Sequence, residues 1–471
     1  MNFRDLSGFP PLFIDYVEGV PPARSFLGDP PDLSTLVTRA AELRQALSRD
    51  AEINRRVPEQ LQKRQSSPSV VENALRLSNP YTVVVLATAP AAVAGGALSV
   101  LLKCLTACRV AAALSSRGIE AVPVCWVGSG LCSLIGTESA WLLDSEAKLR
   151  EISAADAGAL SGEAFAAIME QIAPGRQSIE TLEFLRMNYG GPTLSSACCR
   201  FLSALTQELG LVAIDAAEPQ FESMVAEKFE SLAADASITA EMGMRREELR
   251  RAGYALPDHE SQTGVLIPAV QSLLLPVAVQ VCDPAEICFR AISEPLFSRA
   301  GLASPAAWPR ASATLLDPRS RRFLNRHGLR LNELFLDRDE LLRRILNEPA
   351  QQSAMGRFDA LEKAIQDRLT GFVELVHPDD DLRVTVETSR GKMLYQIGKL
   401  KERFMTSIEA RRGAEQRQLE RACNTLAPSG QLQETILSTV HFLLRHTLGL
   451  VRFLYENLEF TKLEHQILSV D

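Results

Sequence analysis

The chain has 471 residues, 46% of them hydrophobic and 23% charged, and its formal net charge is −8. This length exceeds the size at which a single hydrophobic core stops growing, so we expect two or more domains. The negative charge argues against a nucleic-acid-binding protein, because a phosphate backbone requires a basic surface. The hydrophobic content is typical of a soluble globular protein.

The start of the chain and the cysteines indicate the compartment. Met1-Asn-Phe-Arg-Asp5 lacks the apolar stretch of a secretory signal. Nine cysteines include the neighbours Cys198 and Cys199 and the helically spaced Cys104 and Cys108, and none has C-x-x-C spacing. Most lie in apolar runs, so we expect buried free thiols in a reducing cytoplasm. The six histidines are scattered, and no metal site is predicted.

The first 77 residues precede the first β-like run. Residues 1–30 are rich in proline and aromatic side chains, which predicts an irregular arm that packs on the main domain. From residue 33 to 77 apolar residues recur every three or four positions, as at Leu36, Ala40 and Leu43. This spacing predicts helical structure.

A βαβ unit is predicted next. The valine-rich run Thr82–Thr88 is followed by a glycine-containing loop, an Ala/Leu-rich helix over Ala97–Leu114 and a second β-like run, Ala121–Val127. Such a unit implies a parallel sheet, with ligands in the loops at the carboxyl ends of its strands. Those loops are Ala89–Gly96 and Gly128–Ser133, and both are almost bare of reactive side chains.

The same region has a competing interpretation as a membrane span. Val83–Leu102 is twenty residues without a charge, which is long enough to cross a bilayer. Pro90 and the pair Gly95-Gly96 interrupt it, and the apolar spacing changes there from a valine run to helically spaced leucines. A strand followed by a helix is therefore the favoured interpretation.

The rest of the core alternates helical and β-like segments. Helices are predicted over residues 155–187, 193–209 and 223–252, and short strands over 141–144 and 210–215. Loops and strands near a site are predicted over 264–281. A helix then begins at Pro284 with Glu286 in its first turn, and a strand is predicted over 308–318. This alternation predicts an α/β fold with a Rossmann-like parallel sheet.

The composition shifts near Glu333. Two long amphipathic helices, separated by His377–Asp381, predict an antiparallel hairpin or coiled coil over residues 336–428. We therefore expect three parts: an α/β core at 1–335, the coiled coil, and a helical tail at 429–471 that docks on the core. The basic run Arg319, Arg321, Arg322, Arg326 and Arg330 is interpreted as a solvated helix face rather than a nucleotide site.

Between residues 267 and 318 the motifs become specific. They are Pro268-x-x-Gln271-Ser-x-Leu-Leu-Pro276, Pro284-Ala-Glu286-Ile, and Pro309-Arg310-Ala-Ser312-Ala-Thr314-Leu-Leu-Asp-Pro318. They resemble the bacillithiol-biosynthesis cysteine-adding enzymes, the BshC family. Further matching motifs are Leu105-Thr-Ala-x-Arg109, Val122-Pro-Val-x-Trp126-Val, Gly210-Leu-Val-x-x-Asp215, Ala252-Gly-Tyr254, Gly391-Lys392 to Lys399, Pro428-x-Gly430-x-Leu-Gln433-Glu434 and His465-Gln-Ile-Leu. The resemblance covers nearly the whole chain.

The resemblance implies a fold and an activity. The fold is a nucleotidyltransferase-like Rossmann core with a coiled coil that forms a homodimer. The activity is a cysteine ligase that adds L-cysteine to glucosaminyl-malate, with a carboxylate activated by ATP or another nucleotide and attacked by the cysteine amine. The implied partners are these small molecules, not nucleic acid or a membrane. Candidate catalytic residues are Ser129, Glu286 and Arg310; candidate substrate-binding residues are Gly95, Gly96, Lys103, Trp126, Ser129, Gln271, Ser312 and Thr314.

The sequence departs from the family pattern in both loops of the βαβ unit. Where the family's first loop has Gly-Gln-Gln and Gly-Pro, this chain has Ala87-Thr88-Ala89 and Gly95-Gly96-Ala97. Where the second strand of the family ends in Ser-Glu-Asp-His-Asp, this chain has Ser129-Gly130-Leu131-Cys132-Ser133. One histidine and three carboxylates are lost, which leaves open a catalytically degenerate homologue that acts as a dimeric ligand- or partner-binding protein.

The candidates have competing structural roles. Gly95-Gly96 before a helix fits either an anion-binding turn or a close strand–helix packing, and the residues do not decide between them. Lys103 is two turns into the helix, where a solvated face is favoured over phosphate contact. Ser129 has no nearby histidine in the sequence, which disfavours a nucleophile.

Overall fold

The computed structural model describes residues 1–128, 139–153, 161–172, 179–255, 262–375 and 380–470. The chain forms two compact units, one made of Met1–Pro318 with Gln431–Asp471 and the other of Arg319–Gly430. These units divide the chain after Pro318 and Gly430, whereas the expected breaks were after residues 335 and 428. The segment Gln431–Asp471 belongs to the same unit as the N-terminal α/β segment.

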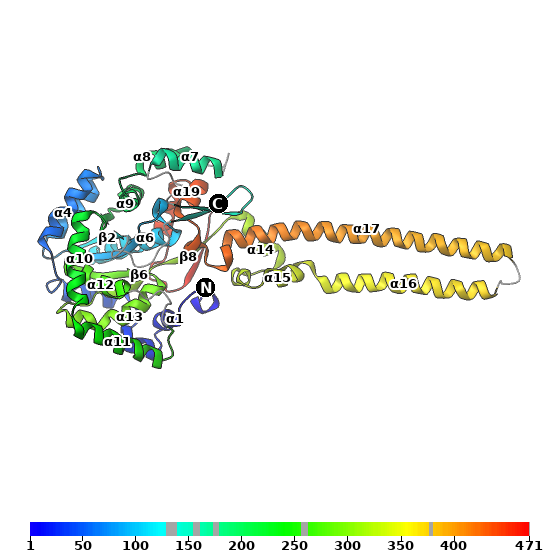
Figure 1. The fold of residues 1–471 in the computed structure, drawn as a ribbon, viewed down its shortest axis with the longest axis horizontal. Helices are drawn as coiled ribbons and strands as arrows, with labels where there is room; N and C mark the ends of the chain where they lie inside the picture. Colours follow the sequence, from blue (N-terminus) through cyan, green and yellow to red (C-terminus); the bar gives the residue numbers. More distant parts are fainter. Residues whose placement is uncertain (129–138, 154–160, 173–178, 256–261, 376–379, 471) are drawn as a thin grey trace. The chain divides into compact units, whose positions relative to one another are not determined.

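A parallel sheet forms the centre of the first unit (Figure 1). Its strands are β1 (Val83–Pro90), β2 (Ala121–Gly128), β5 (Val212–Asp215), β6 (Val277–Cys282) and β7 (Ala306–Pro309), in the order β5-β2-β1-β6-β7. The four neighbouring pairs are all parallel. The predicted parallel, Rossmann-like sheet is therefore confirmed, with β1 at its centre.

The predicted βαβ unit is confirmed, with bounds within two residues of those expected. β1 pairs with β2 in register from Val83 opposite Ala121 to Pro90 opposite Gly128. The helix α6 (Leu98–Ser115) connects the two strands. β2 is buried along its whole length, which explains why both strands are unbroken apolar runs rather than alternating ones.

Helix α6 is a core helix of this unit. It is long and apolar enough to cross a membrane by length and composition, but 72% of its 18 residues are buried inside the fold. The uncharged run Val83–Leu102 divides into a strand, a turn and the start of α6, as the change in spacing predicted. The apolar character of α6 follows from packing on nearly all sides.

Helices surround the sheet. They are α1 (Pro11–Val17), α2 (Pro21–Leu27), α3 (Leu33–Leu43), α4 (Ala51–Lys63), α5 (Pro68–Leu75), α7 (Gly162–Ile172), α8 (Ile179–Asn188), α9 (Leu194–Leu205), α10 (Pro219–Ala233), α11 (Ala236–Arg251), α12 (Gln262–Leu274), α13 (Pro284–Arg299), α18 (Gln433–Ile436), α19 (Thr439–His446) and α20 (Gly449–Asn457), with 3-10 turns η1 (Phe3–Asp5), η2 (Arg76–Ser78), η3 (Val93–Gly95) and η5 (Gln207–Leu209).

Several segment predictions were wrong. Residues 1–30 are not irregular but form α1 and α2, each of which begins at a proline in the favourable first position. Residues 264–281 form most of α12 and then β6, because an apolar run buried on all sides has no period that separates helix from strand. Residues 223–252 contain two helices, since Asp235 caps the start of α11.

Two small sheets join segments that are distant in the sequence. β3 (Ala140–Leu143) pairs antiparallel with β4 (Leu149–Ile152), and β8 (Ser312–Leu316) pairs parallel with β9 (His465–Ser469). The expected single strand over 308–318 is thus two strands, β7 and β8, in different sheets. The expected all-helical tail instead ends in a strand, because β8 offers a pairing edge that the local sequence does not reveal.

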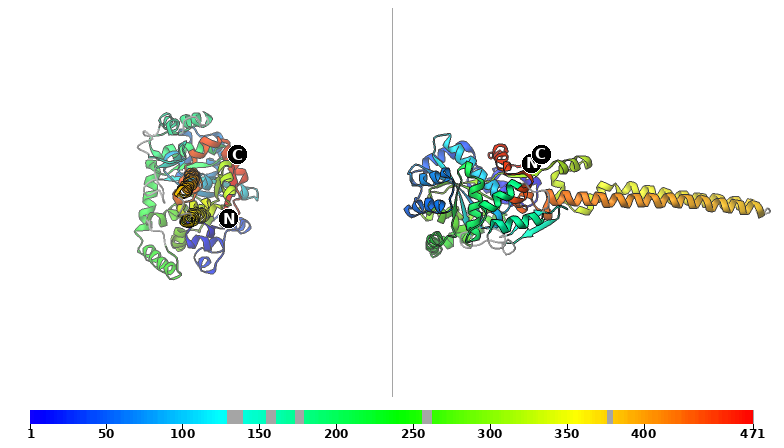
Figure 2. Two further views of the ribbon diagram at one scale, coloured as in Figure 1. Left: turned by 90° about the vertical axis from the view of Figure 1, so that its right-hand side faces the viewer. Right: turned by 90° about the horizontal axis from the view of Figure 1, so that it is seen from above.

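The second unit is a helical hairpin. Its elements are α14 (Pro318–His327), η6 (Leu331–Phe335), α15 (Arg338–Leu346), α16 (Glu348–Leu375), α17 (Asp380–Leu426) and η7 (Pro428–Gly430). α16 and α17 run side by side in Figure 1 and are seen end-on next to each other in the left view of Figure 2, with the rings of Phe358 and Phe404 5.5 Å apart. The predicted antiparallel coiled coil is confirmed, and most of its expected connection lies outside the described residues.

Candidate functional site

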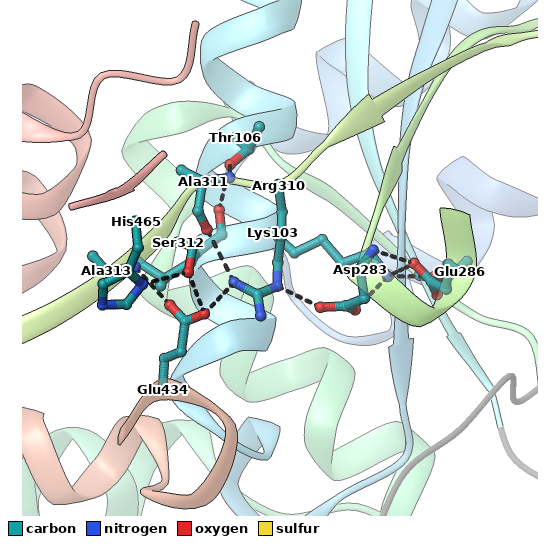
Figure 3. A network of polar contacts seen from close by, with 12 residues as sticks. Lys103, Thr106, Asp283, Glu286, Arg310, Ala311, Ser312, Ala313, Glu434 and His465 are labelled. Carbon is teal, nitrogen blue, oxygen red and sulfur yellow. Dashed lines mark hydrogen bonds and ion pairs between the residues drawn. The ribbon is translucent and has the colours of Figure 1, made fainter. Parts of the chain in front are cut away.

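The switch point of the sheet gathers charged side chains. β2 and β5 lie on one side of β1, and β6 and β7 lie on the other. In such sheets ligands bind at the carboxyl ends of the strands where the order reverses, which here is between β1 and β6. We call the side chains joined there the ionic network (Figure 3). It consists of Thr88, Lys103, Asp283, Glu286, Arg310, Ser312, Glu434 and His465.

Lys103 is the first cation of the network. Its side chain is 2% exposed, and its Nζ lies 3.0 Å from Asp283 Oδ2 and 2.5 Å from Glu286 Oε2. It also donates to Thr88 Oγ1 at 2.8 Å. Burial alone would lower the pKa of Lys103, but the two carboxylates raise it above its ordinary value. The predicted solvated face was wrong, because its acidic partners come from a segment far along the chain.

Asp283 is the accessible member of this group. It follows β6 directly, and its side chain is 35% exposed, whereas those of Lys103 and Arg310 are 2% exposed. Burial would raise the pKa of Asp283, but Lys103 and Arg310 outweigh it and hold the pKa at about 2. Asp283 therefore presents a permanently ionised carboxylate at the carboxyl edge of the sheet.

Glu286 is a buried member of the network. It lies in the first turn of α13, as predicted, and its Oε2 accepts the backbone N–H of Asp283 at 2.7 Å, as in a capping box. Thr88 donates to its other oxygen at 2.6 Å. Burial raises the pKa of Glu286 above its ordinary value despite the neighbouring Lys103. With both oxygens engaged and only 11% of its side chain exposed, Glu286 positions its neighbours.

Arg310 carries the network to the C-terminal segment. Its Nε donates to Asp283 Oδ1, and its Nη1 donates to Glu434 Oε1 at 2.8 Å. Glu434 lies in α18 and is completely buried. The two carboxylates occupy different edges of the planar guanidinium, which fixes its orientation.

Hydroxyls and a histidine complete the chain of contacts. The Ser312 hydroxyl lies 2.7 Å from Glu434 Oε1 and 2.8 Å from His465 Nδ1, and Thr314 Oγ1 lies 2.8 Å from His465 Nε2. Because Ser312 has one proton and Glu434 accepts it, His465 Nδ1 must donate and Nε2 must accept. Burial lowers the pKa of His465 to about 4, which is consistent with this neutral tautomer.

The first loop is a packed turn. Gly95 and Gly96 have φ values of +75° and +77°, and a Cβ on Gly95 would lie 2.9 Å from the Phe201 ring. The Gly96 N–H donates to the Val93 carbonyl at 3.0 Å, and the N–H of Leu98 at the start of α6 donates to the Leu437 carbonyl at 2.9 Å. These two donors are used within the fold, and the contact with Phe201 shows that Gly95 lies in a close-packed turn.

Two other predicted site residues are in the core. Trp126 is completely buried in β2. Gln271 is completely buried in α12, where its Oε1 accepts from Gln280 Nε2 at 3.2 Å. Both side chains are enclosed by the core. Ser129 and the rest of the second loop up to Ser133 lie outside the described residues.

The cysteines are mostly in the core around α6. The eight within the described residues are buried and free of disulfides, as predicted for these positions, and Cys132 lies outside them. The Sγ atoms of Cys104 and Cys125 lie 3.6 Å apart. Burial raises the pKa of Cys198 to about 12, so its thiol is neutral and unreactive at physiological pH.

The sequence interpretation singled out Glu286, Arg310, Ser312 and Thr314 only through the family resemblance, and all four lie in or against the network. It missed four members, which are Thr88, Asp283, Glu434 and His465. Thr88 stood in the first loop only as part of a departure from the family pattern. Asp283 was detectable as the residue before Pro284, three positions ahead of Glu286, which is a capping-box spacing. Glu434 and His465 stood in matching motifs but gave no chemical signal of their own.

Comparisons with known proteins agree with this fold. The family model "Bacillithiol biosynthesis BshC, N-terminal Rossmann-like domain" matches residues 2–263, and "Bacillithiol biosynthesis BshC, C-terminal coiled-coil domain" matches residues 313–470. A Solibacter usitatus protein named "putative cysteine ligase BshC" is 23% identical over 84% of this chain and 86% of its own length. A Koribacter versatilis protein of the same name is 24% identical over 86% and 87%.

Proposed function

The chain belongs to the bacillithiol biosynthesis BshC family, and from this premise we propose that it is a ligase that adds cysteine to glucosaminyl-malate. The observation that carries the proposal is the ionic network at the switch point between β1 and β6. It lies where this class of fold binds its ligands, and it presents one accessible carboxylate, Asp283.

The charge of the network favours an ammonium ligand. It contains two cationic side chains and three carboxyl groups, so it carries one net negative charge when all are ionised. Forming an amide requires an amine, which reaches the enzyme as an ammonium ion at neutral pH. In the proposed site Asp283 binds this ammonium, while Lys103 and Arg310 hold the carboxylate in place.

An activating nucleotide is part of the proposed reaction, because a free carboxylate is a poor electrophile for amide formation. At the turn after β1 the N–H groups of Gly96 and Leu98 are bonded within the fold, so neither serves as a phosphate donor there. The ammonium of Lys103 is likewise enclosed by carboxylates. We therefore assign no residue to the nucleotide.

The test is direct synthesis. Purified protein receives glucosaminyl-malate, cysteine and ATP, and the thiol product is measured by mass spectrometry. We expect product from the wild type and about a 100-fold lower rate from Asp283→Asn, which keeps the shape but loses the charge. Glu227→Gln, at an exposed acid in α10, should match the wild type. Absence of wild-type product, together with failure to restore bacillithiol in a deletion strain, would contradict the ligase proposal.

A second candidate function is a non-catalytic homologue that binds a ligand or partner as a dimer. The observation that favours it is the first loop, whose departure from the family pattern coincides with a turn packed against Phe201. This candidate predicts that calorimetry detects binding of cysteine or glucosaminyl-malate and that no product forms in the presence of ATP. The two candidates thus differ in turnover rather than in binding.

We also propose a homodimer through the coiled coil. Apolar side chains remain exposed along α16 and α17, including Tyr395 at 61%, Leu400 at 58% and Val384 at 56%. An exposed apolar stripe on a helical hairpin favours a second copy as its cover. Leu400→Glu should shift the sedimentation coefficient to that of a monomer. The buried free thiols support a reducing compartment such as the cytoplasm.

A further inference from the structure

Glu434 is a carboxylate with no access to solvent. Its exposed fraction is 0%, and it accepts three hydrogen bonds, from Arg310 Nη1 at 2.8 Å, from Ser312 Oγ at 2.7 Å and from the Ala313 N–H at 2.7 Å. A buried carboxylate is costly unless it is paired and fully hydrogen-bonded. Here both conditions are met, so the fold retains Glu434 at a position where an apolar side chain would be simpler to accommodate.

The position of Glu434 controls the orientation of Arg310. The guanidinium is planar, and its Nε edge meets Asp283 while its Nη1 meets Glu434 (Figure 3). Arg310 is 4% exposed and cannot turn toward water to find another partner. If Glu434 lost its charge, the guanidinium would keep Asp283 and the Ala311 carbonyl, which lies 3.1 Å from Nη1, but would lose the second of its two charged partners. The carboxylate of Asp283 would then be held at one oxygen by Lys103 and at the other by a less fixed Arg310.

We propose that Glu434, which touches no ligand itself, is a positioning residue that holds the Asp283 carboxylate in its ligand-binding orientation through Arg310. This inference rests on the proposed role of Asp283 as the ammonium-binding group. It makes the C-terminal segment a working part of the site, although α18 is about 150 residues beyond β6 in the sequence.

Side chains from β8 and β9 also fix Glu434. Ser312 in β8 donates to its Oε1 and accepts from His465 in β9, and Thr314 holds the other nitrogen of that imidazole. The parallel pairing of β8 with β9 places these groups together. Glu434 is therefore a rigid reference point between the tail and the end of β7.

The chain offers a matched control beside Glu434. Gln433 lies in the same helix, is 1% exposed, and bonds both the N–H and the carbonyl of Leu315 in β8 at 2.8 and 3.0 Å. Gln433→Leu therefore loosens the same helix from the same strand, without touching the two ion pairs that Arg310 makes with Asp283 and Glu434. A general structural role would make it equivalent to Glu434→Gln.

The experiment is a double-mutant cycle on binding, with activity as a second readout. Cysteine and glucosaminyl-malate are titrated separately by calorimetry into the full-length wild type, Glu434→Gln, Asp283→Asn, the double variant, Glu434→Asp and Gln433→Leu. We expect Glu434→Gln and Asp283→Asn to weaken the same one substrate by about 10- to 100-fold, and the double variant to be no weaker than Asp283→Asn alone. Glu434→Asp should recover part of the loss, and Gln433→Leu should stay within about twofold of the wild type.

The outcomes separate this inference from the ligase proposal. Additive losses in the double variant, or equal losses in Gln433→Leu and Glu434→Gln, would overturn the positioning role. A wild type that binds a substrate but forms no product would contradict the ligase while the binding cycle still decides the role of Glu434. A wild type that binds neither substrate would overturn both.

Discussion

The two sides of β1 are built from opposite chemistry. Toward β6, its carboxyl end meets buried ions, with Lys103 held between Asp283 and Glu286. Toward β2, the turn that follows β1 packs against Phe201 and the thiol of Cys198, whose pKa burial raises to about 12. The conspicuous glycine pair of the sequence lies on the apolar side. The groups suited to chemistry lie on the other and come from segments far apart in the chain.

The two sides of β1 differ in what stabilises them. The apolar side gains stability from close packing, which needs only shape, so glycine and small side chains suffice. The ionic side bears the desolvation of several charges, which is recovered only when each charge keeps its partners. The stability of the ionic side should therefore fall when any one charged residue is removed. The stability of the packed side should fall when a larger side chain is introduced.

The largest effect is expected from Lys103→Met. This change leaves Asp283 and Glu286 without their shared cation, and removing one partner of a buried ion pair costs about 3–5 kcal/mol. Urea denaturation should show this loss in the free energy of unfolding. The double variant Lys103→Met with Glu286→Gln should recover part of it, because one of the two stranded charges is then removed.

Lys148→Met is the matched surface control. Lys148 pairs with Glu146, but both side chains are more than 60% exposed, so the urea midpoint should not change. A Lys103→Met variant with a urea midpoint equal to that of Lys148→Met would show that the ionic side does not depend on the pairing of its buried charges. The contrast between the two sides of β1 would then no longer hold.

How much of this could be predicted depends on the range of the interactions. The strands β1 and β2 and the helix α6 follow from local spacing, and the hairpin of α16 and α17 follows from its apolar stripes, so all were predicted. The network was not, because Lys103 and Asp283 are 180 positions apart and neither is unusual in its own segment. The same reason hid β9, whose pairing partner β8 begins 153 residues earlier.

An intermediate effect is expected from pH, through His465. Its pKa is about 4 in the folded protein against an ordinary value of 6.5, so between these values the unfolded chain binds a proton that the folded chain does not. The contribution of neutral His465 to the free energy of unfolding is therefore fully present above pH 6.5. It is lost as the pH falls toward 4, and the total loss is about 3 kcal/mol.

The measurement is the free energy of unfolding at several pH values for the wild type and His465→Gln, which also offers one donor and one acceptor. The difference between the two proteins should shrink as the pH falls from 6.5 to 4. His441, which is also buried and has a lowered pKa, is present in both proteins and cancels. A difference independent of pH would mean that His465 titrates normally and that the network is open to water.

The smallest of the three effects concerns the packed side, through Gly95→Ala. Gly95 and Gly118 both have positive φ, at +75° and +81°, so an alanine is strained at either position. A Cβ on Gly95 also meets the Phe201 ring at 2.9 Å, whereas nothing lies within 4 Å of a Cβ on Gly118. Gly95→Ala should therefore lose about 2 kcal/mol more than Gly118→Ala in urea denaturation. Its Michaelis constant for ATP should stay at the wild-type value, because this turn packs against α9 and we propose that it does not hold a phosphate. A raised Michaelis constant with little loss of stability would reverse the assignment and move the anion site to the β2 side of the strand.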